Sequence, residues 1–255
     1  MVLSYAKGGN LCYQLNKIYD EFNWILKLNS LLNIIRGLKI IHQKQMVHRD
    51  FHTGNLLFYK DLKLVSRIIC ISDMGLCGEV GNTDDTKIYG IMPYVAPEIL
   101  RGNPYTRAAD IYSFGMVMYF IATGKQPFSD FAHDYHLALI ILKDTRPEIH
   151  EREAPKFYIE LMKKCLDSNP KNRPETSEIY DFIDKITSIN DKEIVKQLEE
   201  AEENRKANLK HHQLTSAHPQ AVYVSRDLYP LTRSLQDYGN LIFNQVHCFK
   251  LYLNV

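Results

Sequence analysis

The chain contains 255 residues, of which 45% are hydrophobic and 24% are charged, and its formal net charge at pH 7 is +1. A chain of this kind can bury a large core, and its near-neutral charge gives no indication of nucleic-acid or membrane-surface binding. No signal peptide and no apolar run of roughly 18 residues is visible, and the cysteines lack zinc-ligand spacing. We therefore expect an intracellular, cytoplasmic protein without a membrane partner.

The first segment, residues 1–11, reads as a short apolar strand followed by the break Gly8-Gly9. By itself this pattern is more typical of an edge strand and a turn than of a binding site. The two glycines also lack the three-glycine spacing of a phosphate-binding loop.

Residues 22–42 carry apolar side chains at three- and four-residue intervals, which predicts a long and mostly buried helix. We expect Lys27 and Ser30 on its polar face. Farther along the chain, residues 56–59 and 67–72 predict two short strands.

The second half of the chain is predicted to be helical. The pattern predicts an apolar helix over residues 109–122 with Gly124 as its C-cap, followed by amphipathic helices over residues 135–143, 155–166 and 175–186. Together these segments indicate a mainly α domain.

The composition changes near residue 188. Residues 191–210 are dense in charge and predict a solvated helix, whereas residues 214–255 show turns and scattered aromatic residues without a period. We expect a folded domain over residues 1–187 and a charged helix with a disordered tail over residues 188–255.

Three short patterns occur in order within the folded domain. They are His48-Arg49-Asp50-Phe51-His52-Thr53-Gly54-Asn55, Asp73-Met74-Gly75 and Ala96-Pro97-Glu98. The first places an acid five positions before an amide, in a segment too rich in Gly and polar residues to be a helix. Their order and spacing resemble the catalytic loop, the metal-binding motif and the end of the activation segment of eukaryotic protein kinases.

This resemblance covers about residues 3–186. It implies a mainly α fold, the kinase-like C-terminal lobe with short β-hairpins, followed by an extended C-terminal tail. It also places the start of the chain in the hinge between the two lobes of that family. The glycine-rich loop, the strand Lys and the helix Glu of the N-terminal lobe would then lie upstream. We therefore expect the N-lobe to be absent, in a fragment of a longer kinase or a large lobe that stands alone.

The resemblance implies an enzyme of signalling that uses ATP and Mg²⁺ to phosphorylate a protein substrate. Asp50 would accept the proton of the substrate hydroxyl, while Asn55 and Asp73 would hold Mg²⁺. The implied nucleotide-binding residues are Leu3 as the gatekeeper, Ser4 and Ala6 through their backbones, and Leu57 beneath the adenine.

The resemblance also implies supporting residues. His48 and Gly75 belong to the first two motifs, and the glycine allows a sharp turn. Asp110 would hold the backbone of the catalytic loop from beneath. Glu98 would form a buried ion pair with Arg173.

Arg49 is expected to bind a phosphate carried by the activation segment, residues 75–98, because a guanidinium binds phosphate through paired hydrogen bonds. The candidate phosphosites are Thr83, Thr86 and Tyr89. The alternative is an acidic loop that is not modified.

The acceptor type is less clearly indicated. Residues 90–98 resemble the segment that receives the substrate peptide, but His52 and Ile91 replace the Lys and Thr that serine/threonine kinases usually have. The Arg that tyrosine kinases usually have shortly after the catalytic Asp is also missing. Pro93-Tyr94 favours a serine/threonine kinase of the tyrosine-kinase-like group, with tyrosine as the less favoured acceptor.

Two other classes of function remain as alternatives. His48 and His52 are four residues apart, as in zinc hydrolases, but the adjacent Glu and the helix of such a site are missing. An inactive pseudokinase or a protein-interaction module is the stronger alternative, because half of the nucleotide cleft is not seen. The presence of Asp50, Asn55 and Asp73 argues against it.

Overall fold

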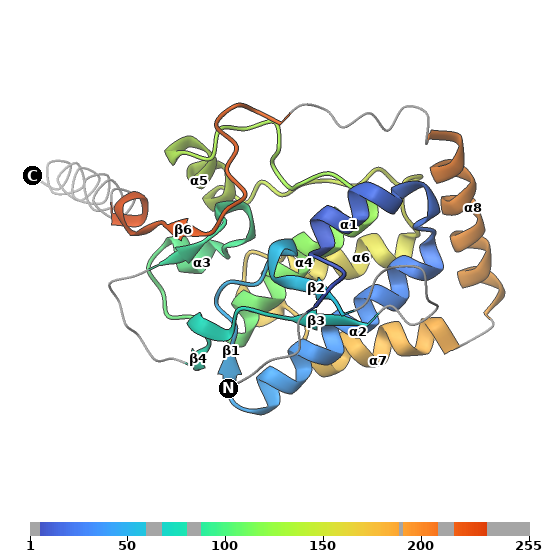
Figure 1. Ribbon diagram of the computed structural model, residues 1–255, viewed down its shortest axis with the longest axis horizontal. Coiled ribbons are helices and arrows are strands. Elements are labelled where there is room, and N and C mark those ends of the chain that lie inside the picture. The colour runs from blue at the N-terminus through green and yellow to red at the C-terminus, as the bar shows by residue number, and fades with distance from the viewer. Residues whose placement is uncertain (1–5, 60–67, 81–87, 189–190, 209–216, 234–255) are drawn as a thin grey trace, which may run out of the picture.

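The computed structural model describes residues 6–59, 68–80, 88–188, 191–208 and 217–233, and within them helices dominate (Figure 1). The α-helices are α1 (Leu11–Ile18), α2 (Trp24–Gln43), α3 (Pro97–Leu100), α4 (Arg107–Thr123), α5 (Tyr135–Leu142), α6 (Lys156–Cys165), α7 (Thr176–Ser188) and α8 (Lys192–Asn208). Each predicted helix is confirmed, with its ends within two residues of the predicted ones. In this described part of the chain, no helix combines the length and apolar character needed to cross a bilayer.

The strands form three antiparallel pairs within the described residues. These are β1 (Met46–Val47) with β4 (Gly78–Glu79), β2 (Leu56–Phe58) with β3 (Ile69–Ile71), and β5 (Tyr89–Gly90) with β6 (Arg226–Asp227). The β2–β3 pair confirms the two strands predicted over residues 56–59 and 67–72. The β5–β6 pair joins segments far apart in the sequence, and no local pattern indicated it.

Helix α4 lies at the centre of the core. From Ala109 to Ala122 every side chain except that of Tyr119 is buried, as expected for a helix that is apolar on all sides. The helix ends at Gly124, which adopts the left-handed conformation (φ 69°) and donates its N–H to the Phe120 carbonyl at 2.8 Å. The predicted C-cap is confirmed.

Helix α2 packs along α7 and α4 (Figure 1), but its buried face differs from the predicted one. Lys27 and Ser30, expected on the polar face, are buried, whereas Ile25 is 54% exposed. The Lys27 ammonium donates to the Ala122 carbonyl at 2.7 Å, close to the C-terminus of α4, where a cation is favoured. This long-range partner satisfies a polar side chain inside the core, where burial lowers the pKa of Lys27 to about 7.

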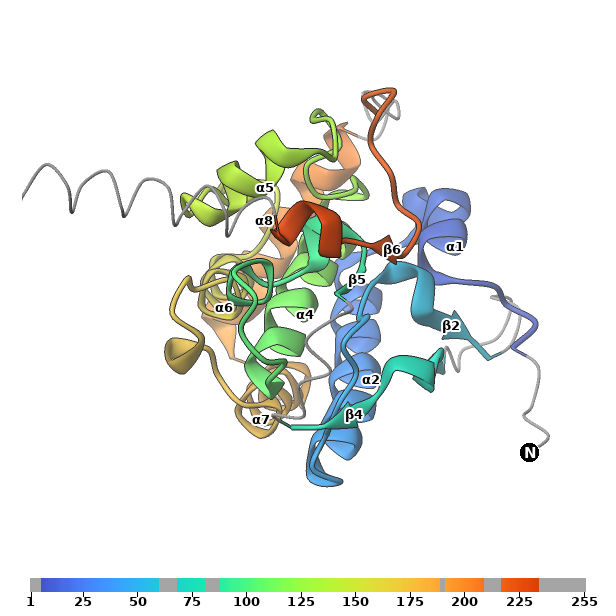
Figure 2. The ribbon, with the colours of Figure 1, turned by 90° about the vertical axis from the view of Figure 1, so that its left-hand side faces the viewer.

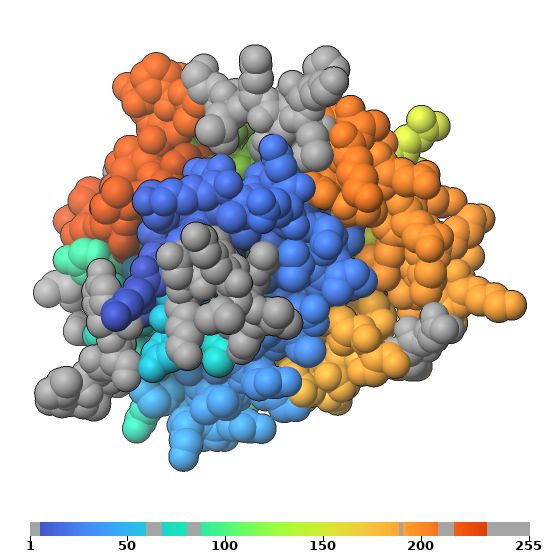
Figure 3. All heavy atoms as spheres, turned by 45° about the vertical axis from the view of Figure 1, so that its right-hand side comes forward, coloured from blue at the N-terminus to red at the C-terminus, as the bar shows by residue number. Residues whose placement is uncertain are grey.

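Helix α8 forms as predicted, but it is not simply solvated. Its Arg205 is buried and donates to the carbonyls of Tyr19 and Asp20, each at 3.1 Å, and its Glu202 accepts the N–H of Trp24 at 3.3 Å. Figure 3 shows α8 in orange against the body of the molecule. The helix is therefore held at the surface by polar contacts with the first residue of α2 and with residues that precede it.

Residues 217–233 also take a defined position, which differs from the disordered tail expected there. The segment contains β6 and lies beside β5 and the loop before α5 (Figure 2). Residues 189–190, 209–216 and 234–255 of the same predicted region lie outside the described residues.

Candidate active site

The loop of residues 48–55 is supported from beneath by one buried carboxylate. Asp110, on α4, is 1% exposed and accepts the backbone N–H groups of His48 at 2.8 Å and Arg49 at 3.1 Å. The same carboxylate lies 2.9 Å from Nε2 of His42, at the end of α2. The contact expected between Asp110 and the loop backbone is therefore present, and it ties the loop to two core helices.

Asp50 lies on the upper side of this loop and is 5% exposed. The Asn55 amide nitrogen donates to the Asp50 carbonyl at 2.9 Å and lies 3.4 Å from its carboxylate. Nδ1 of His52 accepts the Gly54 N–H at 3.0 Å, so the proton of the neutral ring is on Nε2, which lies 3.4 Å from Asp50 Oδ1. The loop thus aims two polar side chains at a single carboxylate.

These neighbours set the ionisation of Asp50. Burial raises the pKa of the carboxyl group, but hydrogen bonding by His52, the nearby His52 ring, hydrogen bonding by Ser225 and the nearby His48 ring together outweigh it. The pKa of Asp50 is therefore held below its usual range. The group is a carboxylate at neutral pH, able to accept a hydrogen bond or a proton.

The β2–β3 pairing brings Asp73 to the same place. Both the N–H and the hydroxyl of Ser72 donate to the Asn55 carbonyl, at 2.8 and 3.0 Å, and Asp73 is the next residue. His48 contacts this point as well, since its Nε2 lies 3.0 Å from the Ser72 carbonyl. Asn55 is thus hydrogen-bonded both to Asp50 and to the residue that precedes Asp73.

Two residues of the site have strained backbones. Asp73 (φ 57°, ψ 62°) and Arg49 (φ 71°) both adopt the left-handed conformation, which is costly for residues other than glycine and is concentrated at functional sites. Asp73 is exposed, and Gly75 follows it in a short turn. The strain at Asp73 coincides with the sharp change of direction expected at this motif.

The residues predicted to contact a nucleotide base are only partly described. Leu3 and Ser4 lie outside the described residues, whereas Ala6 and Leu57 are half-buried. The Gly8 N–H donates to the Phe58 carbonyl at 3.0 Å, and the Phe58 N–H donates to the Gly9 carbonyl at 2.9 Å. These bonds run residues 8–10 alongside β2, so the start of the chain approaches the strand that carries Leu57.

The activation segment is described at its two ends. Arg49 donates to the Glu79 carbonyl at 3.3 Å and lies over the Tyr105 ring, 5.8 Å from its centroid. Tyr89 belongs to β5, and its carbonyl accepts the Tyr105 hydroxyl at 3.3 Å. The other two candidate phosphosites, Thr83 and Thr86, lie outside the described residues.

The predicted contact between Glu98 and Arg173 is confirmed. The guanidinium binds the carboxylate through two hydrogen bonds of 2.6 and 2.8 Å, and it also donates to the carbonyls of Ala108 and Asp167, both at 2.8 Å. Both side chains are buried. The bidentate geometry satisfies the pair and connects the end of the activation segment to the turn before α7.

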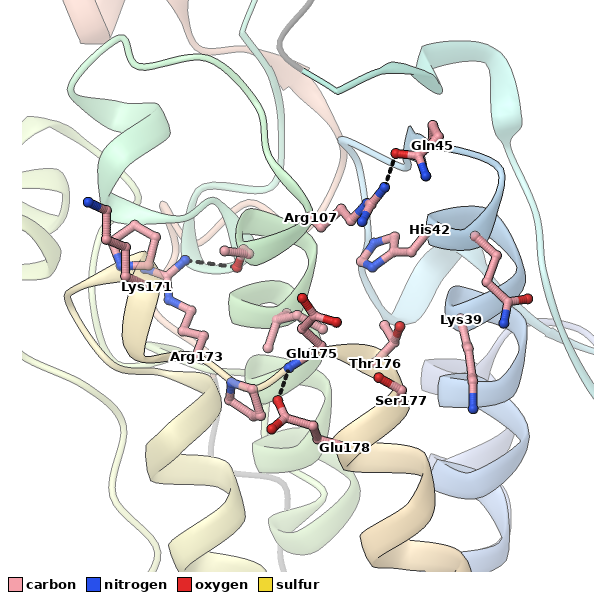
Figure 4. Close-up of a pocket in the computed structure, with 15 residues that line it drawn as sticks. Lys39, His42, Gln45, Arg107, Lys171, Arg173, Glu175, Thr176, Ser177 and Glu178 are labelled. Carbon is pink, nitrogen blue, oxygen red and sulfur yellow. Dashed lines mark hydrogen bonds between the residues drawn. The ribbon is translucent and has the colours of Figure 1, made fainter.

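A hollow of about 840 Å³ lies beneath this region (Figure 4). Its lining includes Lys39, Arg107 and Lys171, and Arg107 is hydrogen-bonded to Gln45 across its rim. Of the predicted site residues only Arg173 borders it, and that guanidinium is engaged by Glu98. The hollow is thus separate from the site around Asp50.

Sequence reasoning missed three residues that shape the site. The contact of His42 with Asp110 depends on the packing of α2 against α4, and no local pattern indicates it. The sequence identified His52 only as a departure from the family pattern, but its ring faces Asp50. The hydroxyl of Ser225 also reaches Asp50, although Ser225 lies in a region where no motif was found.

Comparisons with known proteins agree with this geometry. A family model for protein tyrosine and serine/threonine kinases matches residues 1–183. The chain is similar to a probable serine/threonine-protein kinase of Dictyostelium discoideum, with 30% identity over 191 residues, covering 72% of this chain and 14% of that protein. It is also similar to a serine/threonine/tyrosine-protein kinase of Arabidopsis thaliana (29% identity, covering 72% of this chain and 46% of that protein).

A third relative is mitogen-activated protein kinase kinase kinase 1 of Mus musculus, with 28% identity over 188 residues, covering 70% of this chain and 12% of that protein. The chain therefore spans less than half the length of each of these three relatives.

Proposed function

The chain belongs to the protein tyrosine and serine/threonine kinase family, and we propose that it transfers the γ-phosphoryl group of ATP to serine or threonine residues of a protein substrate. The observation that carries this function is the cluster in which Asn55 contacts both Asp50 and the residue before Asp73. Asn55 contacts the proposed proton acceptor through its side-chain amide and the residue before the proposed metal ligand through its backbone carbonyl.

The donor set suits Mg²⁺. Asn55 uses its amide nitrogen toward Asp50, which leaves the amide oxygen as the atom that can face a cation, and Asp73 offers an exposed carboxylate. Amide and carboxylate oxygens are the ligands that Mg²⁺ takes alongside substrate phosphates. Bound Mg²⁺–ATP would supply the phosphoryl group and a cation that neutralises its charge.

The residues of the chain would act mainly by positioning. Asp50 orients the acceptor hydroxyl and accepts its proton, for which its low pKa keeps it ionised. Nε2 of His52 faces the carboxylate at 3.4 Å, and Asp110 keeps the loop backbone in place. Leu57 and the segment around Ala6 would line the adenine site, next to Leu3 and Ser4.

Serine and threonine are the acceptors we favour. The Dictyostelium relative is named a serine/threonine kinase, and the Arabidopsis relative a serine/threonine/tyrosine kinase. We further propose an intracellular, cytoplasmic setting with a protein substrate in signalling. The free thiols of Cys12, Cys70, Cys77 and Cys165 are compatible with a reducing compartment.

The test is an Asp50→Ala substitution in the full-length protein. We expect phosphorylation of a serine-containing peptide to fall about 10²–10⁴-fold, as on loss of a general base, while Mg²⁺–ATP still binds. Glu160→Ala, at a 61%-exposed carboxylate on α6, is the matched control and should retain full turnover. Unchanged turnover of the Asp50 variant would refute the assignment, and a wild-type protein that binds peptides without any phosphoryl transfer would favour an interaction module.

A further inference from the structure

A second segment of the chain lies on the site. Residues 217–233, here called the docked segment, pair through β6 with β5, with Arg226 opposite Gly90 and Asp227 opposite Tyr89. Figure 2 shows β6 in red beside β5. Strand β5 begins the part of the activation segment that was expected to receive the substrate peptide, so the docked segment adds a strand where a peptide would bind.

The docked segment is anchored on both sides of β6. On the C-terminal side, Leu228 is 1% exposed and donates its N–H to the Ile88 carbonyl at 2.7 Å. On the N-terminal side, the buried His133 ring contacts the Val222 backbone at 2.9 Å and packs edge-on against Tyr223, with centroids 4.7 Å apart. Arg226 adds a hydrogen bond to the His133 carbonyl. These contacts combine backbone pairing with burial, as in a bound peptide.

The register of β6 places Ser225 beside the site. Ser225 directly precedes Arg226, which pairs with Gly90, and a Cβ atom added at Gly90 would lie 3.5 Å from Asp50 Oδ1. Ser225 is half-buried, whereas its neighbour Val224 is 71% exposed. The Ser225 side chain also contributes to the lowered pKa of the Asp50 carboxyl group. A serine hydroxyl beside the catalytic acid is the arrangement that an acceptor residue needs before phosphoryl transfer.

We propose that the docked segment is an intramolecular substrate, which occupies the peptide-binding face of the kinase and presents Ser225 as its phosphoacceptor. This role rests on the proposed phosphoryl transfer. The docking itself does not, since it involves only contacts within the chain.

The reaction is the one proposed for an external substrate. The Ser225 oxygen forms a bond to the γ-phosphorus of ATP, and the bond from that phosphorus to the β,γ-bridging oxygen breaks. ADP leaves with the electron pair of the broken bond, and the proton of the Ser225 hydroxyl passes to Asp50. The product is phosphoserine at position 225.

The modification would also change the docking. Phosphoserine carries nearly two negative charges at neutral pH, and at position 225 it would lie beside the ionised Asp50. Like-charge repulsion in a buried setting disfavours this contact. The docked segment should therefore leave the face after modification and allow external substrates to bind.

The docking is tested first, without nucleotide, by hydrogen exchange of the full-length protein. We expect slow exchange at residues 88–90 and 226–228, accelerated about tenfold or more by Ser225→Asp and by Leu228→Asp. Ser225→Ala should keep the protection, because the anchoring contacts remain. Val224→Ser, at the exposed neighbour, is the matched control and should exchange like the wild type. Fast exchange of residues 226–228 in the wild type would overturn the docking.

The acceptor role is tested by mapping phosphate after incubation with Mg²⁺–ATP. We expect phosphate on Ser225 at a rate independent of protein concentration, as for a reaction within one molecule, and no phosphate there in Asp50→Ala. The Ser225→Ala variant keeps the segment docked and cannot release it by phosphorylation, so it should phosphorylate an added serine peptide more slowly than the wild type.

These outcomes distinguish the acceptor role of Ser225 from the proposed phosphoryl transfer. Phosphorylation of the added peptide with Ser225 left bare would overturn the acceptor role and leave the proposed function standing. Absence of any phosphoryl transfer would overturn the proposed function and the acceptor role together, while the exchange data would still decide the docking.

Discussion

Two buried carboxylates, Asp110 below the 48–55 loop and Asp50 above it, differ in what satisfies them. Asp110 is 1% exposed and contacts two backbone N–H groups and the His42 ring. Asp50 is 5% exposed and lies against Asn55 and His52 from its own loop, while Ser225 of the docked segment helps to lower its pKa. The first set belongs entirely to the core, whereas part of the second belongs to a segment that an external substrate could replace.

This difference separates scaffold from chemistry. A carboxylate whose partners are all core groups positions the backbone and has no capacity left for a substrate. A carboxylate with one exchangeable partner can accept a hydroxyl group in its place. We therefore expect substitutions of Asp110 and other buried supporting residues to reduce the stability of the fold. Substitutions around Asp50 should instead change turnover and docking.

The largest effect on stability is expected at the Glu98–Arg173 pair, which is buried and joined by two hydrogen bonds. Arg173→Met should lower the free energy of unfolding by about 3–5 kcal/mol, because it leaves the Glu98 carboxylate buried without its charged partner. Urea denaturation measures the change. The double substitution Arg173→Met with Glu98→Leu is the control and should recover most of the loss. A single variant as stable as the wild type would contradict the role of this pair as buried support.

A smaller effect should distinguish the two carboxylates directly. Asp110→Asn should cost about 1.5–3 kcal/mol, since an amide cannot accept all the hydrogen bonds that the carboxylate accepts and presents a donor to a backbone N–H. The isosteric Asp50→Asn is the matched control, with an expected loss of stability of no more than about 1 kcal/mol and a large loss of turnover. Equal losses of stability for the two variants in urea denaturation would show that Asp110 does not support the fold more than Asp50 does.

The smallest effect is expected when the pH is changed. It should alter the stability of the docked segment through protonation of His133, which lies beneath that segment. Burial lowers the pKa of His133, hydrogen bonds to the Val222 and Phe128 carbonyls oppose this, and the nearby charges of Arg226 and His218 lower it further. Because the docked form disfavours the protonated ring, docking should be fully stable above the ordinary histidine pKa of about 6.5 and should weaken as the pH falls through and below that value.

Hydrogen exchange of the Leu228 amide, corrected for the intrinsic effect of pH on exchange, measures this dependence. His133→Gln should remove most of it. Protection that increases on acidification would show that the sign assigned to His133 is incorrect.

Much of the fold was predictable because its signals are local. Helical periodicity located α2, α4, α5, α6 and α7 within two residues, and Gly124 ended α4 as expected. The contact between Glu98 and Arg173 was also predicted, but through the family resemblance and not from the periodic pattern. Lys27 shows the limit of such reasoning. Its polar side chain was assigned to the exposed face, because its partner, the Ala122 carbonyl, is distant in sequence.

The sequence by itself determined the helical segments and the five-residue spacing between Asp50 and Asn55, since both depend on neighbours along the chain. Only the tertiary structure decided which groups satisfy the buried charges, and it alone brought Ser225 to Asp50. The reason is physical: a hydrogen bond needs two groups within about 3 Å of each other, and for segments this far apart that proximity is set by the packing of the whole core.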